Sequence, residues 1–124
     1  MQATVDWQLR IERGPEWLFV SVAPPDDPRF SAPPLAEMVW GAAQQHRLQR
    51  VVLELDDVEL LHSYLIGQLV LIARRVYASG GLLRLTGVSE ANIAALRTCR
   101  LEGALPIYQD RHAAVLGLRS DHPR

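Results

Sequence analysis

The sequence has little cysteine and no strong excess of either charge. Cys99 is the single cysteine among 124 residues, which excludes an internal disulfide framework and a zinc site built from cysteine alone; we expect it to be a small core residue. Lysine and arginine together number 13, against 14 aspartates and glutamates. Since proteins that bind nucleic acid or anionic membranes usually carry a basic excess, we expect neither as a partner.

Long hydrophobic runs are also missing. The longest apolar stretch, residues 64–72, contains a glutamine and is too short to cross a bilayer. Residues 1–14 show no basic segment followed by an apolar run, so no signal peptide is predicted. The chain is therefore expected to be a cytoplasmic, single-domain protein over residues 1–124, with its core at about residues 4–117.

One strand and the helix after it organise the chain. Residues 51–55 form a short, β-branched and apolar run, which is typical of a strand buried on both faces. Apolar residues then recur at helical spacing, namely Leu65, Leu69, Ile72 and Val76. Gly80 and Gly81 are expected to end this helix. Ser63 stands between strand and helix, either as a plain helix cap or as a site of phosphate chemistry in the positive field of the helix amides.

The remaining segments alternate between strands and helices. Residues 4–12 and 16–23 predict two strands of an antiparallel hairpin. The other expected elements are a proline loop at 24–34, a helix from about Pro34, a strand at 82–86, a helix capped by Ser89, a short strand at 104–108 and a helix capped by Asp110. Strands separated by a single helix should be parallel. The predicted fold is α/β, with a mixed sheet of four to five strands and about four helices, mostly on one face.

Two loops are the best candidates for a functional site. Asp26 and Asp27 lie in the proline loop, and Asp56 and Asp57 follow the central strand. Both loops run from a strand into a helix. Because ligands of parallel sheets meet the carboxyl ends of the strands, we expect these loops at one end of the sheet.

From Val51 to Val115 the sequence resembles the STAS domain, the family of bacterial anti-sigma-factor antagonists. The resemblance rests on the order of segments: an apolar strand, a turn that opens a helix, a Gly-Gly-x-Leu-x-Leu strand beginning at Gly80, a short helix, a segment with an aromatic residue and a terminal helix. It extends over roughly residues 4–117. It implies a single STAS-like domain that binds a partner protein and is not an enzyme.

The family's Asp-Ser-(Ser/Thr)-Gly-Leu-Gly turn falls on residues 62–67. Ser63 matches the serine that a partner kinase phosphorylates, and Gly67 matches the second glycine. His62 replaces the family's aspartate and Leu65 its first glycine. The resemblance implies an anti-sigma-factor antagonist that binds an anti-sigma factor or related serine protein kinase and is switched by phosphorylation of Ser63. Association into a homo-oligomer is left open.

The helix after Ser63 suggests a docking surface. Its outward stripe should contain Tyr64, Gln68, Leu71 and Arg75. A helix phase shifted by one residue would instead place Leu71 in the core, and both readings stay open. The complete set of expected partner-binding residues is Asp26, Asp27, Asp56, Asp57, His62, Ser63, Tyr64, Gly67, Gln68 and Leu71.

Two other functions remain as alternatives. In the first, Ser63 is only a helix cap in a degenerate STAS module that binds its partner constitutively. Alternatively, Ser63 with His62 or His46 and Asp56 would form a small serine hydrolase, although the sequence has no Gly-x-Ser-x-Gly elbow. The histidines show no metal-ligand spacing and no glycine-rich phosphate loop is present, so neither a metal nor a cofactor is expected.

Overall fold

The computed structural model describes residues 6–28 and 31–118. Its sheet has four strands in the order β1-β2-β3-β4. The elements in chain order are β1 (Gln8–Arg13), β2 (Leu18–Ala23), α1 (Leu35–His46), β3 (Arg50–Glu54), α2 (Ser63–Ala78), β4 (Leu82–Thr86), α3 (Glu90–Thr98) and α4 (Arg111–Leu116). The predicted start of the first strand at residue 4 lies outside the described residues.

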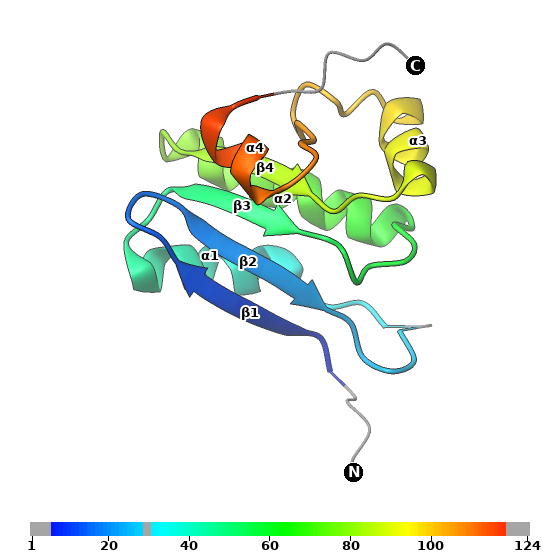
Figure 1. Ribbon diagram of the computed structural model, residues 1–124. Coiled ribbons are helices and arrows are strands. Elements are labelled where there is room, and N and C mark those ends of the chain that lie inside the picture. The colour runs from blue at the N-terminus through cyan, green and yellow to red at the C-terminus, as the bar shows by residue number, and fades with distance from the viewer. Residues whose placement is uncertain (1–5, 29–30, 119–124) are drawn as a thin grey trace.

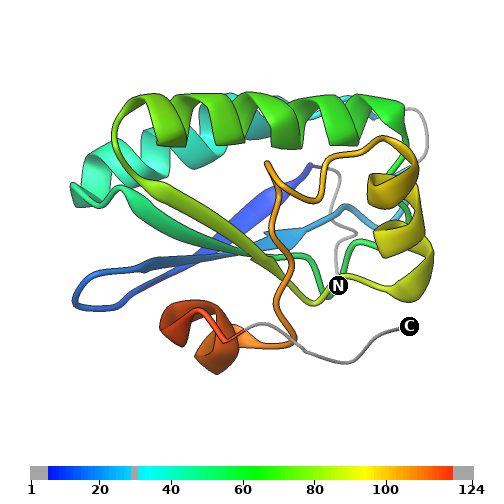
Figure 2. The same cartoon turned by 90° about the horizontal axis from the view of Figure 1, so that it is seen from above.

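The sheet is mixed, as the sequence predicts. β1 and β2 pair antiparallel, whereas β2 with β3 and β3 with β4 pair parallel. α1 and α2 lie side by side on one face of the sheet, and α4 lies on the opposite face (Figure 2). The two faces of β3 are both buried, because Leu53 packs under α1 and α2 while Val52 packs toward Tyr108 and Ala114 on the α4 side.

The predicted strand at residues 104–108 is wrong. Only one parallel bridge, between Leu85 and Ile107, joins this segment to β4. The Leu85 N–H donates to the Pro106 carbonyl at 2.9 Å, and the Tyr108 N–H donates to the Leu85 carbonyl at 2.8 Å. The ladder does not extend further along the segment, and Pro106 itself has no N–H with which to extend it.

Three helix ends agree with the sequence. The Ser89 side chain accepts a hydrogen bond from the Asn92 N–H, and the Asp110 side chain accepts one from the Ala113 N–H. Gly80 takes the left-handed conformation that ends α2, with φ of 85°. Cys99, however, is exposed rather than part of the core. The reason is that α3 ends at Thr98, so the helical spacing that would turn Cys99 inward no longer applies there.

Arg111 fastens α4 to the sheet. Its Nε and Nη2 donate to the two carboxylate oxygens of Glu54 at 2.8 and 3.0 Å, and its Nη1 lies 3.0 Å from Glu12. The hydrogen bond to Glu54 raises the pKa of Arg111 above its usual range, so the guanidinium stays charged. The same group lies 4.2 Å from the ring centroid of Phe19. α4 is therefore held by ion pairs as well as by apolar contacts.

Gly81 has no room for a side chain. A Cβ atom there would lie 1.9 Å from the backbone oxygen of Gln49. We expect Gly81→Ala to lower the free energy of unfolding by about 2–3 kcal/mol, measured by urea denaturation. The reason is that the backbone at Gly81, just before β4, would have to move away from Gln49, just before β3. Gly103→Ala is the matched control, since its Cβ would enter open space. Equal stability of the two variants would contradict the expected close packing at Gly81.

Candidate functional site

The aspartate loops lie at one end of the sheet, as predicted. The proline loop follows β2 and residues 55–62 follow β3, and these strands are parallel neighbours (Figure 1). Asp26, Asp27, Asp56 and Asp57 are all exposed. Asp57 lies 3.7 Å from Arg10, a contact that solvent screens because both side chains are more than half exposed. This end of the molecule therefore carries an acidic rim.

Asp56 packs against the end of β4. A Cβ atom on Gly87 would lie 2.2 Å from Asp56 Oδ1, so the carboxylate occupies the space beside the Gly87 backbone. Gly87 has a φ of 68°, a conformation that glycine adopts without strain. Asp56 thus spans the carboxyl ends of β3 and β4, while its exposed surface remains at the rim.

Residues 55–62 form an anchored loop that leads into α2. Val58 and Leu61 are buried, whereas Leu60 between them is 64% exposed. The side chain of Asn92 on α3 is hydrogen bonded to the backbone of this loop at Val58, Glu59 and Leu61. The sequence reading missed both Leu60 and Asn92. The available signals were a pair of adjacent leucines just before the helix, of which only one can be buried, and a polar residue on an apolar helix stripe.

Ser63 is the first residue of α2 and not its cap. The N-cap position belongs to His62, whose side chain makes no capping hydrogen bond. The prediction of a capping serine is therefore wrong by one residue. Ser63 is exposed, and within the described residues its hydroxyl has no hydrogen-bond partner. Its oxygen still lies in the first turn of a helix of 16 residues, where the free backbone N–H groups favour negative charge.

Three residues of the expected outward stripe have partners on α1 or in the loop before it. Arg75 pairs with Glu37 of α1 at 2.6 Å. The Tyr64 hydroxyl donates to the carbonyls of Ala32 and Pro33 at 3.2 and 2.8 Å. Gln68 Oε1 accepts a hydrogen bond from the Ala36 N–H at 3.0 Å. Because the first N–H groups of a helix have no partner within it, Gln68 completes the start of α1. The prediction of an outward Gln68 is therefore wrong. Tyr64 supports the proline loop through its hydroxyl, and part of its ring remains exposed.

The outward face of α2 is a row at every fourth position. Ser63, Gly67 and Leu71 are all exposed, and residues four apart lie above one another on a helix. Leu71 is 43% exposed, so the outward reading of this residue is confirmed. Leu60, in the loop that enters the helix, is the most exposed large apolar residue in the described chain. We call Leu60, His62, Ser63, Gly67 and Leu71 the Ser63 face.

Removing the Tyr64 hydroxyl should test its role as a strut. We expect Tyr64→Phe to lower the free energy of unfolding by about 0.5–1.5 kcal/mol, because its carbonyl bonds are lost while the ring is kept. Leu71→Ala should change it by less than about 0.5 kcal/mol, since the leucine is largely exposed. Urea denaturation measures both. A tyrosine variant as stable as the parent would show that the hydroxyl contributes nothing to the fold.

The residues of the suggested hydrolase do not meet. His46 ends α1 beside the start of β3, whereas Ser63 follows the end of β3, so the two lie at opposite ends of the sheet (Figure 2). His62 stacks loosely toward Tyr64, with ring centroids 6.5 Å apart. Within residues 6–28 and 31–118, no three histidine, cysteine or acidic side chains form a group that could hold a metal ion. None of the helices there has the length and hydrophobicity of a membrane span.

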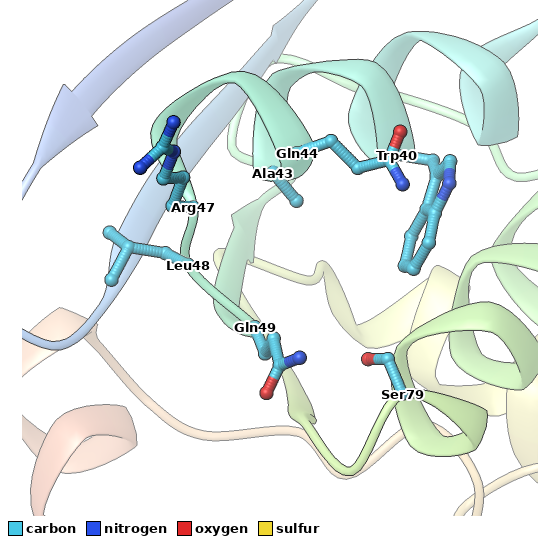
Figure 3. A pocket seen from close by; sticks show the side chains of 7 residues that line it. All are labelled: Trp40, Ala43, Gln44, Arg47, Leu48, Gln49 and Ser79. Carbon is cyan, nitrogen blue, oxygen red and sulfur yellow. The ribbon is translucent and has the colours of Figure 1, made fainter.

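A shallow hollow lies at the end of the molecule away from Ser63. It has a volume of about 410 Å³ and sits between the C-termini of α1 and α2 (Figure 3). Its lining residues are Trp40, Ala43, Gln44, Arg47, Leu48, Gln49 and Ser79. The indole of Trp40 points into the hollow and covers part of its wall. The hollow shares no residue with the Ser63 face.

Comparison with known proteins gives a family and a set of similar folds. The model of the STAS domain matches residues 29–114. Among curated proteins, none matches the sequence of this chain. The solved structures named below are at most 21% identical to this chain, and such a likeness describes the fold alone.

Three solved structures illustrate the similarity. An anti-sigma factor antagonist from Mycobacterium paratuberculosis is 19% identical, with a TM-score of 0.69, over 93% of this chain and 96% of that one. A Ser-to-Glu variant of RsbS from Moorella thermoacetica is 15% identical, with a TM-score of 0.73, over 90% and 94%. A STAS domain protein from Planctomyces limnophilus is 21% identical, with a TM-score of 0.67, over 90% and 98%.

Proposed function

Because the chain belongs to the STAS domain family, we propose that it is an anti-sigma-factor antagonist, a non-catalytic module that binds an anti-sigma factor or a related serine protein kinase. The partner docks on the Ser63 face, with the acidic rim of Asp26, Asp27, Asp56 and Asp57 beside it. Phosphorylation of Ser63 releases the partner. The proposal includes a cytoplasmic location and a single domain.

The exposure of Ser63 at the start of α2 is the observation that carries this proposal. A phosphorylated residue must reach the active site of a kinase, and Ser63 is exposed with Gly67 and Leu71 beyond it on the same face. Gly67 leaves the helix surface flat, since a Cβ there would meet nothing within 4 Å. An exposed leucine on each side of the serine provides apolar area for a partner.

Charge explains how such a site can switch. A phosphate group adds about 1.5 to 2 negative charges at neutral pH. At the N-terminus of α2 the domain itself tolerates this charge, because backbone N–H groups and the helix dipole face it. At an interface lined by Asp56 and Asp57, the same charge would repel the carboxylates around it. Partner affinity then falls while the fold stays as it is.

The departures from the family's turn differ in their consequences. Leu65, which stands where the family has its first glycine, is only 2% exposed and packs into the core. It therefore leaves the surface that a partner meets unaltered. His62 is exposed and replaces an acidic side chain with an imidazole, which carries no negative charge. This exposed change favours the second candidate, a module that binds its partner constitutively and has no phosphorylation at Ser63.

A capture experiment tests the proposal. The wild-type chain serves as bait in native extract of its source cells, and mass spectrometry identifies the captured proteins and the state of the Ser63 peptide. We expect an anti-sigma factor or serine kinase on the unmodified bait, and phosphate on Ser63 after incubation with ATP. Capture without any phosphate supports constitutive binding. Absence of both contradicts the proposal, and labelling of Ser63 by a serine-directed phosphonate would favour a hydrolase.

A further inference from the structure

Asn92 is a buried polar residue on the inner face of α3. Its side chain is 1% exposed. Its Oδ1 accepts a hydrogen bond from the Leu61 N–H at 2.9 Å, and its Nδ2 donates to the carbonyls of Val58 at 3.1 Å and Glu59 at 3.3 Å. These bonds link residues that lie more than thirty positions apart in the chain. α3 thereby grips the loop that precedes Ser63.

An asparagine at this position has a cost that only its bonds offset. Leu96, one turn further along α3, is fully buried and apolar, and an apolar residue at position 92 would also fill the core. Burying an amide is unfavourable unless its donors and acceptors are paired. Here the amide is hydrogen bonded to backbone groups of a loop, which have no partners in a strand or helix. The residue type is thus explained by the loop and not by the packing of α3.

The loop would have little else to hold its backbone. Residues 55–62 belong to no helix or strand. At their two ends, the Leu55 N–H donates to the Thr86 carbonyl and the His62 carbonyl accepts from the Ile66 N–H. Between these ends, the Val58 N–H donates to the Leu55 carbonyl. The side chains of Val58 and Leu61 provide apolar anchors. Leu60 and Ser63 are presented outward immediately beside the residues that Asn92 holds. The position of both on the surface depends on this grip.

We infer that Asn92 is a positioning residue for the partner site: through α3 it fixes the loop that presents Leu60 and Ser63 to a partner protein. α3 lies at the same end of the molecule as the start of α2 (Figure 1). The backbone N–H of Asn92 donates to Ser89 Oγ at the start of α3. The residue that holds the loop is therefore also part of the N-terminal cap of α3. This inference rests on the proposed function, because it assumes that a partner protein binds at this site. Asn92 itself is buried and would not contact that partner.

Hydrogen exchange tests the grip without any partner. In the wild-type chain, the Leu61 amide should be protected although it lies in a loop. Asn92→Leu should speed its exchange at least about tenfold, because a buried hydrogen bond is lost. Ala91→Leu is the matched control, since it places the same leucine on the exposed neighbouring position of α3. Fast exchange of Leu61 in the wild-type chain would overturn the inference, even if the variants failed to fold.

Partner binding separates positioning from a merely structural role. The bait concentration that half-saturates capture of the partner, corrected for the folded fraction, should rise at least about tenfold in Asn92→Leu. Asn92→Asp keeps an acceptor for the Leu61 N–H but turns a buried carboxylate oxygen toward the Val58 and Glu59 carbonyls, and should capture the partner no better than Asn92→Leu. Unchanged capture per folded Asn92→Leu bait would overturn the inference.

The proposed function and this inference fail differently. If the wild-type bait captures no partner and Ser63 is never phosphorylated, the proposed function fails and the claim about partner binding fails with it. The exchange rate of Leu61 then still decides whether Asn92 holds the loop. If the wild-type bait captures its partner and Asn92→Leu captures it equally well, the proposed function stands and the positioning role alone is wrong.

Discussion

Ser63→Asp is expected to weaken partner binding at least about 100-fold, because a fixed negative charge would face the partner in a desolvated interface, where like charges cost several kcal/mol. The melting temperature should stay nearly unchanged or rise slightly. Ser63 is exposed and occupies the first turn of α2, where an aspartate is favourable by about 0.3–1 kcal/mol. Titration of the purified partner by calorimetry and thermal unfolding of the variant measure the two effects.

The control for this variant must have the shape of aspartate without its charge. Ser63→Asn meets that requirement and should lose much less affinity than Ser63→Asp. Ser63→Ala should bind like the wild-type chain and accept no phosphate. If the aspartate variant binds as tightly as the asparagine variant, charge at Ser63 does not control the partner. If both lose all binding, the site tolerates no added volume and the phosphate switch is not needed to explain it.

Gly67→Arg is expected to abolish detectable partner binding while making the fold more stable. A side chain at Gly67 would extend into open space between Ser63 and Leu71 on the exposed face of α2. It would therefore project from the surface proposed to bind the partner, without disturbing the core. Replacing glycine within a helix should raise the free energy of unfolding by about 0.5–1 kcal/mol. Capture of the partner and urea denaturation measure the opposite changes in affinity and stability.

The chain contains a matched control for this variant. Gly41 is an exposed glycine within α1, and a Cβ there also meets nothing within 4 Å. Gly41→Arg adds the same charge and volume to a helix outside the Ser63 face and should gain similar stability. It should bind the partner like the wild-type chain. Loss of binding in both variants would point to net charge and not to the Ser63 face, and normal binding of Gly67→Arg would move the interface elsewhere.

The sequence places Ser63 correctly at an exposed helix start, but it misjudges how the side chains after it are used. Ser63 was expected at the strand-to-helix junction, and its exposure there agrees with that expectation. Helical spacing left Leu71 open between an outward and a core position, and its exposure decides for the outward one. The same spacing could not reveal that Tyr64 and Gln68 have partners on another element, because the proline loop and α1 approach them only after folding. That Tyr64 and Gln68 contact a partner stays a prediction. Tyr64 would do so through the exposed part of its ring, and Gln68 through a half-buried side chain.

What the sequence determined by itself was most of what depends on a short repeat or a local signal, with the Ser63 cap and the position of Cys99 as exceptions. Alternation and helical spacing identified the strands and long helices, glycine ended α2, and Ser89 and Asp110 began their helices, since each of these effects acts within about one helical turn. The tertiary structure alone decided that residues 104–108 join β4 by a single bridge, that Asn92 grips the loop before Ser63, and that Gln68 completes α1. Those outcomes depend on backbone groups that lie far apart in sequence, and only packing of the folded chain brings them within hydrogen-bonding distance.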